Sequence, residues 1–371
     1  MKYFMFCVLY SCGVCPHIFR INSKMCEISS AVPLLLFIVT TLLCRSSLAL
    51  DSFPKLTNVK NFDDYLAQTG KAYPNAKERE FREALFLAKK TIMDLVNQQA
   101  AAGLSTFKLA LNPLADVTHI EVARMTGSKI SFTGEDIISR HSNYVTTELN
   151  PNTLPESFDW RQKGGVSPVR FQGFECGSCW SFATIGSLEG HMFRRTGQLV
   201  PLSEQDLVDC AERYGSMGCD GGFQEYAFEY IRDNGVSLAH KYPYKQMENP
   251  QCIHNQTGAG IYIRDYARIK PGDEDKMKEV IATLGPLACS MNANTISFAQ
   301  YEEGIYDDDE CNKEEVNHSV VVVGYGTENG KDYWIIKNSY SENWGDNGFI
   351  KLARNRNSFC GIANECSYPL L

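Results

Sequence analysis

Residues at helical spacing predict three helices in the first two-thirds of the chain. Six side chains, three or four positions apart, fall on one stripe of the first helix: Glu78, Arg82, Phe86, Lys89, Met93 and Asn97. Residues 178–195 repeat apolar side chains on one face and are followed by a helix-stop glycine, Gly197. Residues 203–206 read Ser-Glu-Gln-Asp, which is typical of the capped start of a third helix.

The pattern changes beyond about Tyr262, where β-branched and aromatic residues form short uninterrupted runs. Residues 319–323 read Ser-Val-Val-Val-Val and residues 333–337 read Tyr-Trp-Ile-Ile-Lys, and both runs are typical of buried strands. A helical half followed by a strand-rich half predicts an α+β fold.

An apolar run of about a dozen residues, 31–44, lies near the N-terminus and ends at Arg45. A membrane-spanning helix needs about 20 residues, so this run suits the apolar core of a secretory signal. The small residues around Ala49 fit a cleavage site, which makes residues 1–49 a signal or targeting segment. The segment is long for a signal, so a start at Met25 and a retained anchor stay open, although no stable membrane span is expected.

Residues 50–152 contain no cysteine and read as largely helical. The polar stretch 134–155, with Pro151 and Pro155 near its end, predicts an exposed linker, and proteolysis concentrates in such segments. A chain of 371 residues is long enough for two or three folding units.

Charge and cysteine content narrow the functional class. A formal net charge of −8 argues against a nucleic-acid binder, whose surface usually carries a basic patch. Five of the 14 cysteines precede Ala49, and the other nine all lie beyond position 175. Cysteines at such density in an exported chain indicate disulfides, and the odd number indicates one thiol kept free for chemistry.

The segment Cys176-Gly177-Ser178-Cys179-Trp180 is the strongest chemical signal. A thiol with a pKa near 8.5 is a poor nucleophile in an acidic compartment, so its thiolate must be stabilised. A position at the start of a helix and a neighbouring imidazolium both provide that stabilisation. A thioredoxin-like redox pair and half of a zinc site are the alternatives, but no βαβ pattern precedes the motif, and the other Cys-x-x-Cys lies in the signal segment.

This motif resembles the nucleophile segment of the papain family, and residues 153–371 resemble its peptidase domain from the Leu154-Pro155 start onward. The helical stripe resembles the interrupted Glu-Arg-Phe-Asn-Ile-Asn motif of that family's prosegments, with Lys89 and Met93 in place of Asn and Ile. A second partial match of the prosegment follows at four alternate positions: Ala110, Asn112, Leu114 and Asp116. The resemblance implies a two-lobed fold, with a helical lobe, a β-barrel-like lobe and a cleft between them, preceded by an inhibitory prosegment at 50–152.

By this resemblance the chain is the zymogen of a cathepsin L-like cysteine endopeptidase. Cys179 is then the nucleophile of an acyl-thioester mechanism, His318 its base, Asn338 the residue that orients His318, and Gln172 an oxyanion donor. A glutamate is expected at the floor of the second specificity pocket. The implied substrate-binding residues are Gly221, Gly222, Phe223, Gln224, Ser290, Ser319, Glu365 and Trp344.

The resemblance also implies three disulfides: Cys176–Cys219, Cys210–Cys252 and Cys311–Cys360. Cys289 and Cys366 are left over, and we expect two buried thiols there, with a fourth disulfide as the alternative. Asn255 begins a glycosylation sequon, whereas the sequon at Asn317 falls next to His318 and is expected to stay unmodified.

Three departures from the family pattern concern the site itself. Tyr340 replaces the tryptophan that covers the Asn–His hydrogen bond, one extra residue lies between Gln172 and Cys176, and Asn317 precedes His318. The first two keep open a rival reading, in which the chain is a catalytically silent homologue that binds or inhibits.

The partners implied are protein and peptide substrates, the chain's own prosegment as an intramolecular inhibitor, and cystatin-like inhibitors. No cofactor, metal or nucleic acid is expected, and the protein is expected to be a monomer. Lysosomal or extracellular location follows from the signal segment, and acid is expected to release the prosegment by protonating its paired carboxylates.

Overall fold

The computed structural model describes residues 52–127, 154–258 and 260–371. The predicted signal segment, the linker up to residue 153 and both predicted boundaries near residues 50 and 153 lie outside the described residues. Residues 53–371 group into one compact unit, so the predicted prosegment and the predicted peptidase region can be described together.

Two helices, a short strand and a third helix make up the prosegment: α3 (Phe62–Thr69), α4 (Ala76–Ala101), β1 (Phe107–Leu109) and α5 (His119–Met125). Asparagine caps start the first two helices, since Asn61 and Asn75 each accept from a backbone N–H one turn on. α5 begins with a capping box, in which Thr118 and Glu121 bond each other's backbone N–H groups. Local sequence therefore defines these helix starts.

The predicted stripe of α4 faces the segment that follows the helix. Phe86 and Met93 are buried on this face. Lys89 Nζ donates to the carbonyl oxygens of Leu114 and Val117, at 2.8 and 2.5 Å. Asn97 exchanges two hydrogen bonds with the backbone of Leu109, at 2.8 and 2.9 Å. The stripe thus fastens the helix to β1 and to the loop beyond it.

The helical lobe contains α7 (Cys179–Thr196), α8 (Glu204–Cys210) and α9 (Gln224–Asn234), with short 3-10 helices η2 (Glu212–Tyr214), η3 (Gly218–Asp220) and η4 (His254–Gln256). α7 is buried along most of its length because it packs against both lobes, including strands of the sheet. It ends at Gly197, whose left-handed backbone, φ 72°, suits glycine.

The second lobe is built on a sheet whose strand order is β1-β5-β8-β7-β6-β4-β9-β3. Its strands are β3 (Asp265–Ile269), β4 (Leu287–Met291), β5 (Tyr301–Tyr306), β6 (His318–Glu328), β7 (Lys331–Lys337), β8 (Phe349–Ala353) and β9 (Cys366–Leu370), and β2 (Phe158–Asp159) pairs with β6. The helices α10 (Glu274–Thr283) and α11 (Ile296–Ala299) and the 3-10 helix η5 (Phe359–Gly361) lie between strands in the sequence. The two predicted strands lie in β6 and β7.

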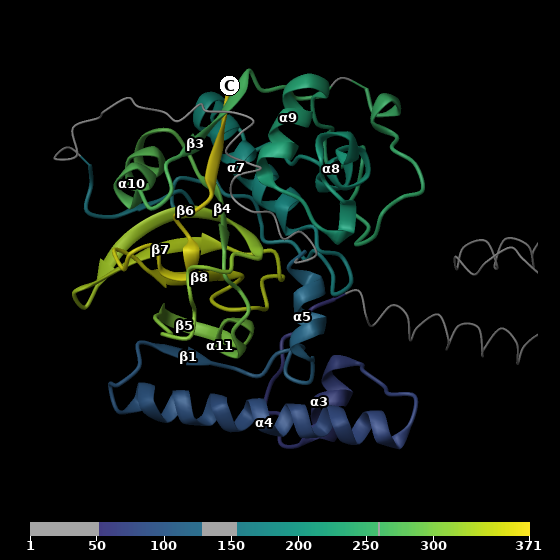
Figure 1. The fold of residues 1–371 in the computed structure, drawn as a ribbon, viewed down its shortest axis with the longest axis vertical. Helices are drawn as coiled ribbons and strands as arrows, with labels where there is room; N and C mark the ends of the chain where they lie inside the picture. The colour runs from purple at the N-terminus through teal and green to yellow at the C-terminus, as the bar shows by residue number, and fades with distance from the viewer. Residues whose placement is uncertain (1–51, 128–153, 259) are drawn as a thin grey trace, which may run out of the picture. The chain divides into compact units, whose positions relative to one another are not determined.

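The prosegment contributes a strand to this sheet, because β1 pairs antiparallel with β5 at its edge. Figure 1 shows α4 lying along β1, and α5 rising from there towards the junction of the helical lobe and the sheet. The prosegment thereby reaches both lobes.

The described part of the chain contains four disulfides. Three are those that the resemblance implied: Cys176–Cys219, Cys210–Cys252 and Cys311–Cys360. The expectation of two buried thiols at Cys289 and Cys366 is wrong, because these residues form the fourth disulfide, with Cα atoms 4.1 Å apart. β4 and β9 pair antiparallel with Cys289 directly opposite Cys366, and only the strand register reveals this.

Within the three described ranges, no helix has the length and apolarity that a bilayer crossing requires.

Candidate active site

Cys179 is the first residue of α7, and only 3% of its surface is exposed to solvent. It is the only free cysteine among the described residues. Its Sγ lies 3.6 Å from the carbonyl oxygen of Thr126, in the prosegment. The helix start points its unpaired backbone N–H groups towards this thiol, a placement that favours negative charge.

His318 is the first residue of β6, a strand that pairs with β4 and packs against α7. Its Nε2 donates to Asn338 Oδ1 at 2.8 Å. That bond assigns the proton to Nε2 and leaves Nδ1, which has no hydrogen-bond partner among the described residues, as a free base. Asn338 Oδ1 also accepts from the N–H of Ser339 at 2.8 Å, so the acceptor is itself held in place.

Burial keeps the pair uncharged in the precursor. It raises the pKa of the Cys179 thiol to about 11 and lowers the pKa of His318 to about 4. Near neutral pH these shifts favour a thiol and a neutral imidazole over a thiolate–imidazolium pair.

Gln172 directs its side-chain amide at the prosegment. Its Nε2 donates to the carbonyl oxygen of Met125 at 2.6 Å and to that of Cys176 at 2.8 Å. Ser339 Oγ donates to Gln172 Oε1 at 2.6 Å, which fixes the amide orientation. The extra residue in this loop does not remove Gln172 from the site, because Gln172 bonds Met125 and the adjacent Thr126 contacts Cys179 Sγ. Gly173 turns the loop with a left-handed backbone, φ 94°.

Tyr340 covers His318, with ring centroids 5.0 Å apart, and only 1% of its surface is exposed. Its hydroxyl has no hydrogen-bond partner in the part of the chain that the structure describes. Trp344 was expected to contact the substrate, but it is completely buried, donates to the carbonyl oxygen of Ala299 at 3.2 Å and packs edge-on against Tyr340. In the precursor it therefore supports Tyr340 rather than lining the cleft.

A pocket of about 30 Å³ remains beside Cys179 with the prosegment in place, roughly the room of one water. Five of the predicted substrate-binding residues line it, together with Thr126 and Gly127 of the prosegment: Gly222, Phe223, Ser290, Ser319 and Glu365. Gln224 does not line the pocket. Its side-chain amide instead donates to Oγ of the lining residue Ser290 at 3.2 Å.

Glu365 is the acidic group of this pocket. Burial, with the nearby Glu225 carboxylate, raises the pKa of Glu365 to about 7, while Ser290 and Arg268 act in the opposite direction. One carboxylate oxygen is buried with no hydrogen-bond partner among the described residues.

The prosegment backbone passes very close to the pocket entrance. A Cβ atom on Gly127 would lie 2.9 Å from the carbonyl oxygen of Gly177 and 3.0 Å from the Cα of Gly221. Gly127 also has a left-handed backbone, φ 66°, so only glycine fits this approach. Met125, Thr126 and Gly127 consecutively cover Gln172, Cys179 and the glycines of the cleft.

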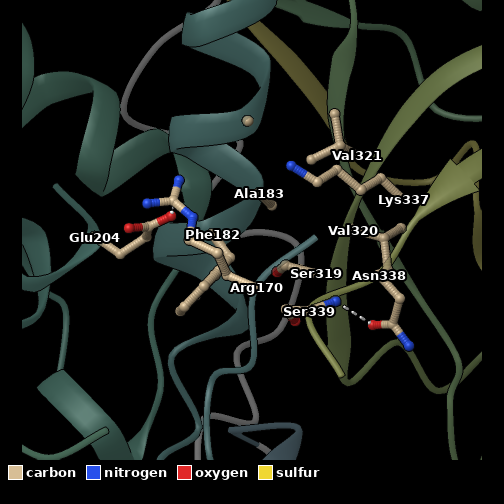
Figure 2. A pocket seen from close by; sticks show the side chains of 11 residues that line it. Arg170, Phe182, Ala183, Glu204, Ser319, Val320, Val321, Lys337, Asn338 and Ser339 are labelled. Carbon is tan, nitrogen blue, oxygen red and sulfur yellow. Dashed lines mark hydrogen bonds and ion pairs between the residues drawn. The ribbon is translucent and has the colours of Figure 1, made fainter. Parts of the chain in front are cut away.

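A buried charged cluster behind the site joins the two lobes. Arg170 contacts Glu204 at 2.5 Å and Glu189 at 3.3 Å, and Lys337 donates to Ser167 Oγ at 2.9 Å. Figure 2 shows Arg170 and Glu204 facing each other, with Lys337 and Asn338 on the strand opposite. Lys337 precedes Asn338, so the cluster fixes the strand end that carries Asn338.

These charged residues were not identified from the sequence. Glu189 lies on an otherwise apolar helix face, and a lone charge there gives no signal until the opposite lobe brings its partners. Burial raises the pKa of Glu204 to about 7 and lowers that of Lys337 to about 8, so the cluster is sensitive to solvent entry.

Comparison with known proteins agrees with this geometry. Residues 154–370 match the model of the papain family cysteine proteases, and residues 62–122 match that of the cathepsin propeptide inhibitor domain. Cathepsin L1 of Drosophila melanogaster is 43% identical over 306 residues, which are 81% of this chain and 82% of that protein. Cathepsin S of Mus musculus is 40% identical over 81% of this chain and 86% of its own.

Solved precursors have the same arrangement of elements. Digestive procathepsin L 3 of the Tenebrio molitor larval midgut superposes with a TM-score of 0.74 at 34% identity, over 84% of this chain and 98% of that one. The chain therefore belongs to the papain family of cysteine proteases. It is a cathepsin L-like cysteine endopeptidase zymogen with an inhibitory propeptide.

Proposed function

We propose that this zymogen hydrolyses peptide bonds through Cys179 once the prosegment is removed. The observation that carries the proposal is the position of two prosegment carbonyl groups. The carbonyl oxygen of Thr126 is 3.6 Å from Cys179 Sγ, and that of Met125 accepts from Gln172 Nε2 at 2.6 Å. The precursor therefore already presents peptide carbonyls to the residues that would act on a substrate.

The first chemical step is attack of the Cys179 sulfur on the substrate carbonyl carbon, while the thiol proton passes to His318 Nδ1. Gln172 Nε2 and the backbone N–H of Cys179 stabilise the oxyanion that forms. The carbon–nitrogen bond then breaks, and His318 gives its proton to the leaving amine. Water, deprotonated by His318, hydrolyses the acyl-thioester and releases the acid and the thiol.

Asn338 is a positioning residue in this scheme, since its bond to His318 Nε2 keeps Nδ1 available towards the cleft. In the precursor the raised pKa of Cys179 and the lowered pKa of His318 oppose the ion pair. Departure of residues 125–127 would admit water and so lower the desolvation cost of charge. The helix-terminal field of α7 would then favour the thiolate–imidazolium pair.

Substitution of the nucleophile tests the proposal directly. Cys179→Ser should fold, keep its disulfides and hydrolyse peptides at background rate. The acid-matured wild type should react with an epoxysuccinyl thiol trap at Cys179 alone, because Cys176 is bonded to Cys219. Hydrolysis retained in Cys179→Ser would refute Cys179 as the nucleophile. A folded wild type that takes no label and cuts no peptide would support the silent-homologue reading instead.

We further propose that Glu365 forms an acidic floor in the second specificity pocket. Its unpartnered carboxylate oxygen and its place beside Ser290 in the pocket next to Cys179 support this assignment. A substrate Arg or Lys two residues before the cut bond would pair with the ionised carboxylate, whereas Leu or Phe would use the apolar walls.

Glu365→Gln preserves the shape and removes the charge. A charge-assisted hydrogen bond contributes about 1.5–3 kcal/mol, so kcat/KM for Arg substrates should fall roughly 10- to 100-fold. Leu substrates are the internal control and should change little. In the wild type the ratio of kcat/KM for Arg substrates to that for Leu substrates should rise with pH as Glu365 ionises. An equal ratio in wild type and Glu365→Gln would contradict the assignment of Glu365 to the pocket floor.

Four disulfides and the cathepsin L-like character support passage through an oxidising secretory pathway, and we propose a lysosomal or extracellular destination. Asn255 is exposed on η4 and remains the proposed glycosylation site. Cystatin-like inhibitors, which would occupy the same cleft, remain proposed partners.

A further inference from the structure

The N-terminal arm of the prosegment, residues 52–61, contains a single buried side chain. Phe53 is 2% exposed, while the other residues of the arm are exposed or half-buried. The ring does not join the prosegment's own apolar cluster around Phe62 and Phe86. It belongs to the core that includes Tyr340 and Trp344 of the peptidase region.

Two aromatic rings of the peptidase region hold Phe53. Its ring centroid lies 5.6 Å from that of Phe171, edge-on, and 6.0 Å from that of Phe174, stacked. Phe171 and Phe174 contact each other at 4.9 Å, edge-on. Asn343 Nδ2 donates to the carbonyl oxygen of Phe53 at 2.9 Å, so backbone and side chain are both recognised.

Phe174 lies in the loop that is one residue longer than the family pattern. Gly173 turns the chain with φ 94°, and Tyr244 holds the loop by donating to the carbonyl oxygen of Gln172 at 2.6 Å. Gln172 thus contacts Met125, the neighbour of the residue that touches the Cys179 thiol, while Phe174 faces Phe53. The extra residue leaves the oxyanion donor in place and adds an aromatic wall beside it.

The position of this wall relative to His318 identifies its side of the cleft. Phe171 forms an antiparallel bridge with Tyr340, whose ring lies 5.0 Å from that of His318. In the mechanism above His318 protonates the leaving amine, so the leaving peptide passes on this side. Glu365 and Ser290 lie in the pocket that Gly127 enters beyond Cys179, which is the opposite side.

We propose that Phe171 and Phe174 form a subsite for an aromatic side chain within the first three residues after the cut bond, and that Phe53 occupies this subsite in the precursor. The inference rests on the proposed function. Asn343 would donate to a substrate carbonyl as it does to Phe53. An aromatic ring can meet both walls in the edge-on and stacked geometries that Phe53 shows, whereas a small side chain would leave both rings in water.

Internally quenched peptides test the subsite on matured enzyme. Each peptide keeps Leu two residues before the cut bond and carries Phe, Trp, Leu, Ala or Asp at one of the three positions after it. At one of these positions we expect wild type to prefer Phe over Ala by at least about tenfold in kcat/KM. Phe174→Ala should reduce that ratio to about twofold or less, and Phe174→Leu should leave it intermediate.

Tyr262→Ala is the matched control, because Tyr262 is a 56% exposed aromatic residue of the same domain, and its ratio should equal that of wild type. Peptides cleaved by wild type without any aromatic preference, or a preference unchanged in Phe174→Ala, would overturn the subsite alone. Peptides left uncut by correctly folded wild type would overturn the proposed function, and the subsite with it.

Labelling of Cys179 in the precursor tests the contact of Phe53 independently. Phe53→Ala should release the arm and increase the rate at which the thiol trap labels Cys179 in the full-length precursor, by several-fold. Phe81→Ala removes a 47% exposed phenylalanine of the prosegment and should label like the unmodified precursor. Equal labelling of all three precursors would contradict the role of Phe53.

Discussion

Individual residues show how this chain departs from its family pattern without losing the family's contacts. Lys89 stands where the prosegment motif has asparagine, yet it is buried and donates to two backbone carbonyls of the facing loop. Burial lowers the pKa of Lys89 to about 8, so the residue still carries its charge below that pH. Lys89 therefore fastens α4 to the loop that follows β1.

Tyr340 is the departure nearest to the reaction. Replacing it by tryptophan should hold or raise turnover, because a larger ring covers the His318–Asn338 bond more completely and orients His318 more firmly. Steady-state kinetics on one peptide measure this. A loss of more than about tenfold, equivalent to ~1.4 kcal/mol in the barrier, would show that Tyr340 has a role of its own.

Tyr340→Phe separates the ring from the hydroxyl. The hydroxyl is buried without a partner among the described residues, so its removal should not lower the midpoint of thermal unfolding of the precursor. A lower midpoint would mean that the hydroxyl makes a stabilising contact after all.

At the scale of elements, one salt bridge ties α4 to α5. Arg82 makes two hydrogen bonds to Glu121, both at 2.6 Å, and further bonds to Glu78 at 2.8 Å and to the carbonyl oxygen of Asp116 at 3.0 Å. α5 leads directly into residues 125–127, which cover the thiol. The bridge therefore determines where the inhibitory backbone lies.

Arg82→Gln should destabilise the prosegment by about 1.5–3 kcal/mol, the range for hydrogen bonds to charged groups. Urea unfolding of the Cys179→Ser precursor, followed by circular dichroism, measures the change without self-cleavage. Arg79→Gln is the matched control, because Arg79 lies on the same helix and pairs only with exposed or half-exposed carboxylates. An equal loss of unfolding free energy in both variants would show that the α4–α5 salt bridge stabilises the prosegment no more than a surface ion pair does.

This bridge is not the acid trigger that we expected from paired carboxylates. Arg82 lowers the pKa of Glu121 to about 2. A carboxylate with a depressed folded-state pKa contributes stability that is complete above its unfolded value near 4.3 and is lost only as pH falls towards 2. The Arg82–Glu121 pair consequently survives at the pH of an acidic compartment.

For the whole molecule, the sequence was most informative where one motif defines one local structure. The helix that begins at Cys179, the stripe of α4 and the strands at 319–323 and 333–337 were predicted from periodicity and local composition. The order of Gln172, Cys179, His318 and Asn338 along the chain allowed the site to be recognised, although only the fold brings these residues together.

What sequence could not predict depends on contacts between distant segments. Cys289 and Cys366 bond because two strands pair in one register. Glu189 and Lys337 are buried together because α7 packs against the sheet. Phe53 and Phe174 meet because the arm of the prosegment returns to the loop at Gln172. None of these pairings has a local pattern.

Two groups in the closed cleft respond to pH in opposite directions. His318 has a pKa of about 4 in the precursor, and opening should return it towards 6.5, so the open form binds more protons between those values. Glu365 has a pKa of about 7, and hydration should return it towards 4.3, so the closed form binds more protons there. Acid thus favours opening through His318 and closing through Glu365.

The Cys179→Ser precursor allows the two contributions to be separated, because with the thiol present opening would pass the thiol proton to His318 and hide the uptake. Hydrogen exchange of the amides of residues 119–127, corrected for intrinsic rates from pH 7 to 4, measures opening.

Adding Glu365→Gln should steepen the acid-induced opening, up to about tenfold per pH unit, the limit for one proton. Adding His318→Gln should instead make opening fall, relative to the parent, as pH drops from 7 to 4.5. Other titrating groups contribute alike to all three proteins, so the differences report these two residues. Three parallel profiles would mean that neither residue changes its pKa when the cleft opens, and the acid response would then have to come from groups outside the cleft.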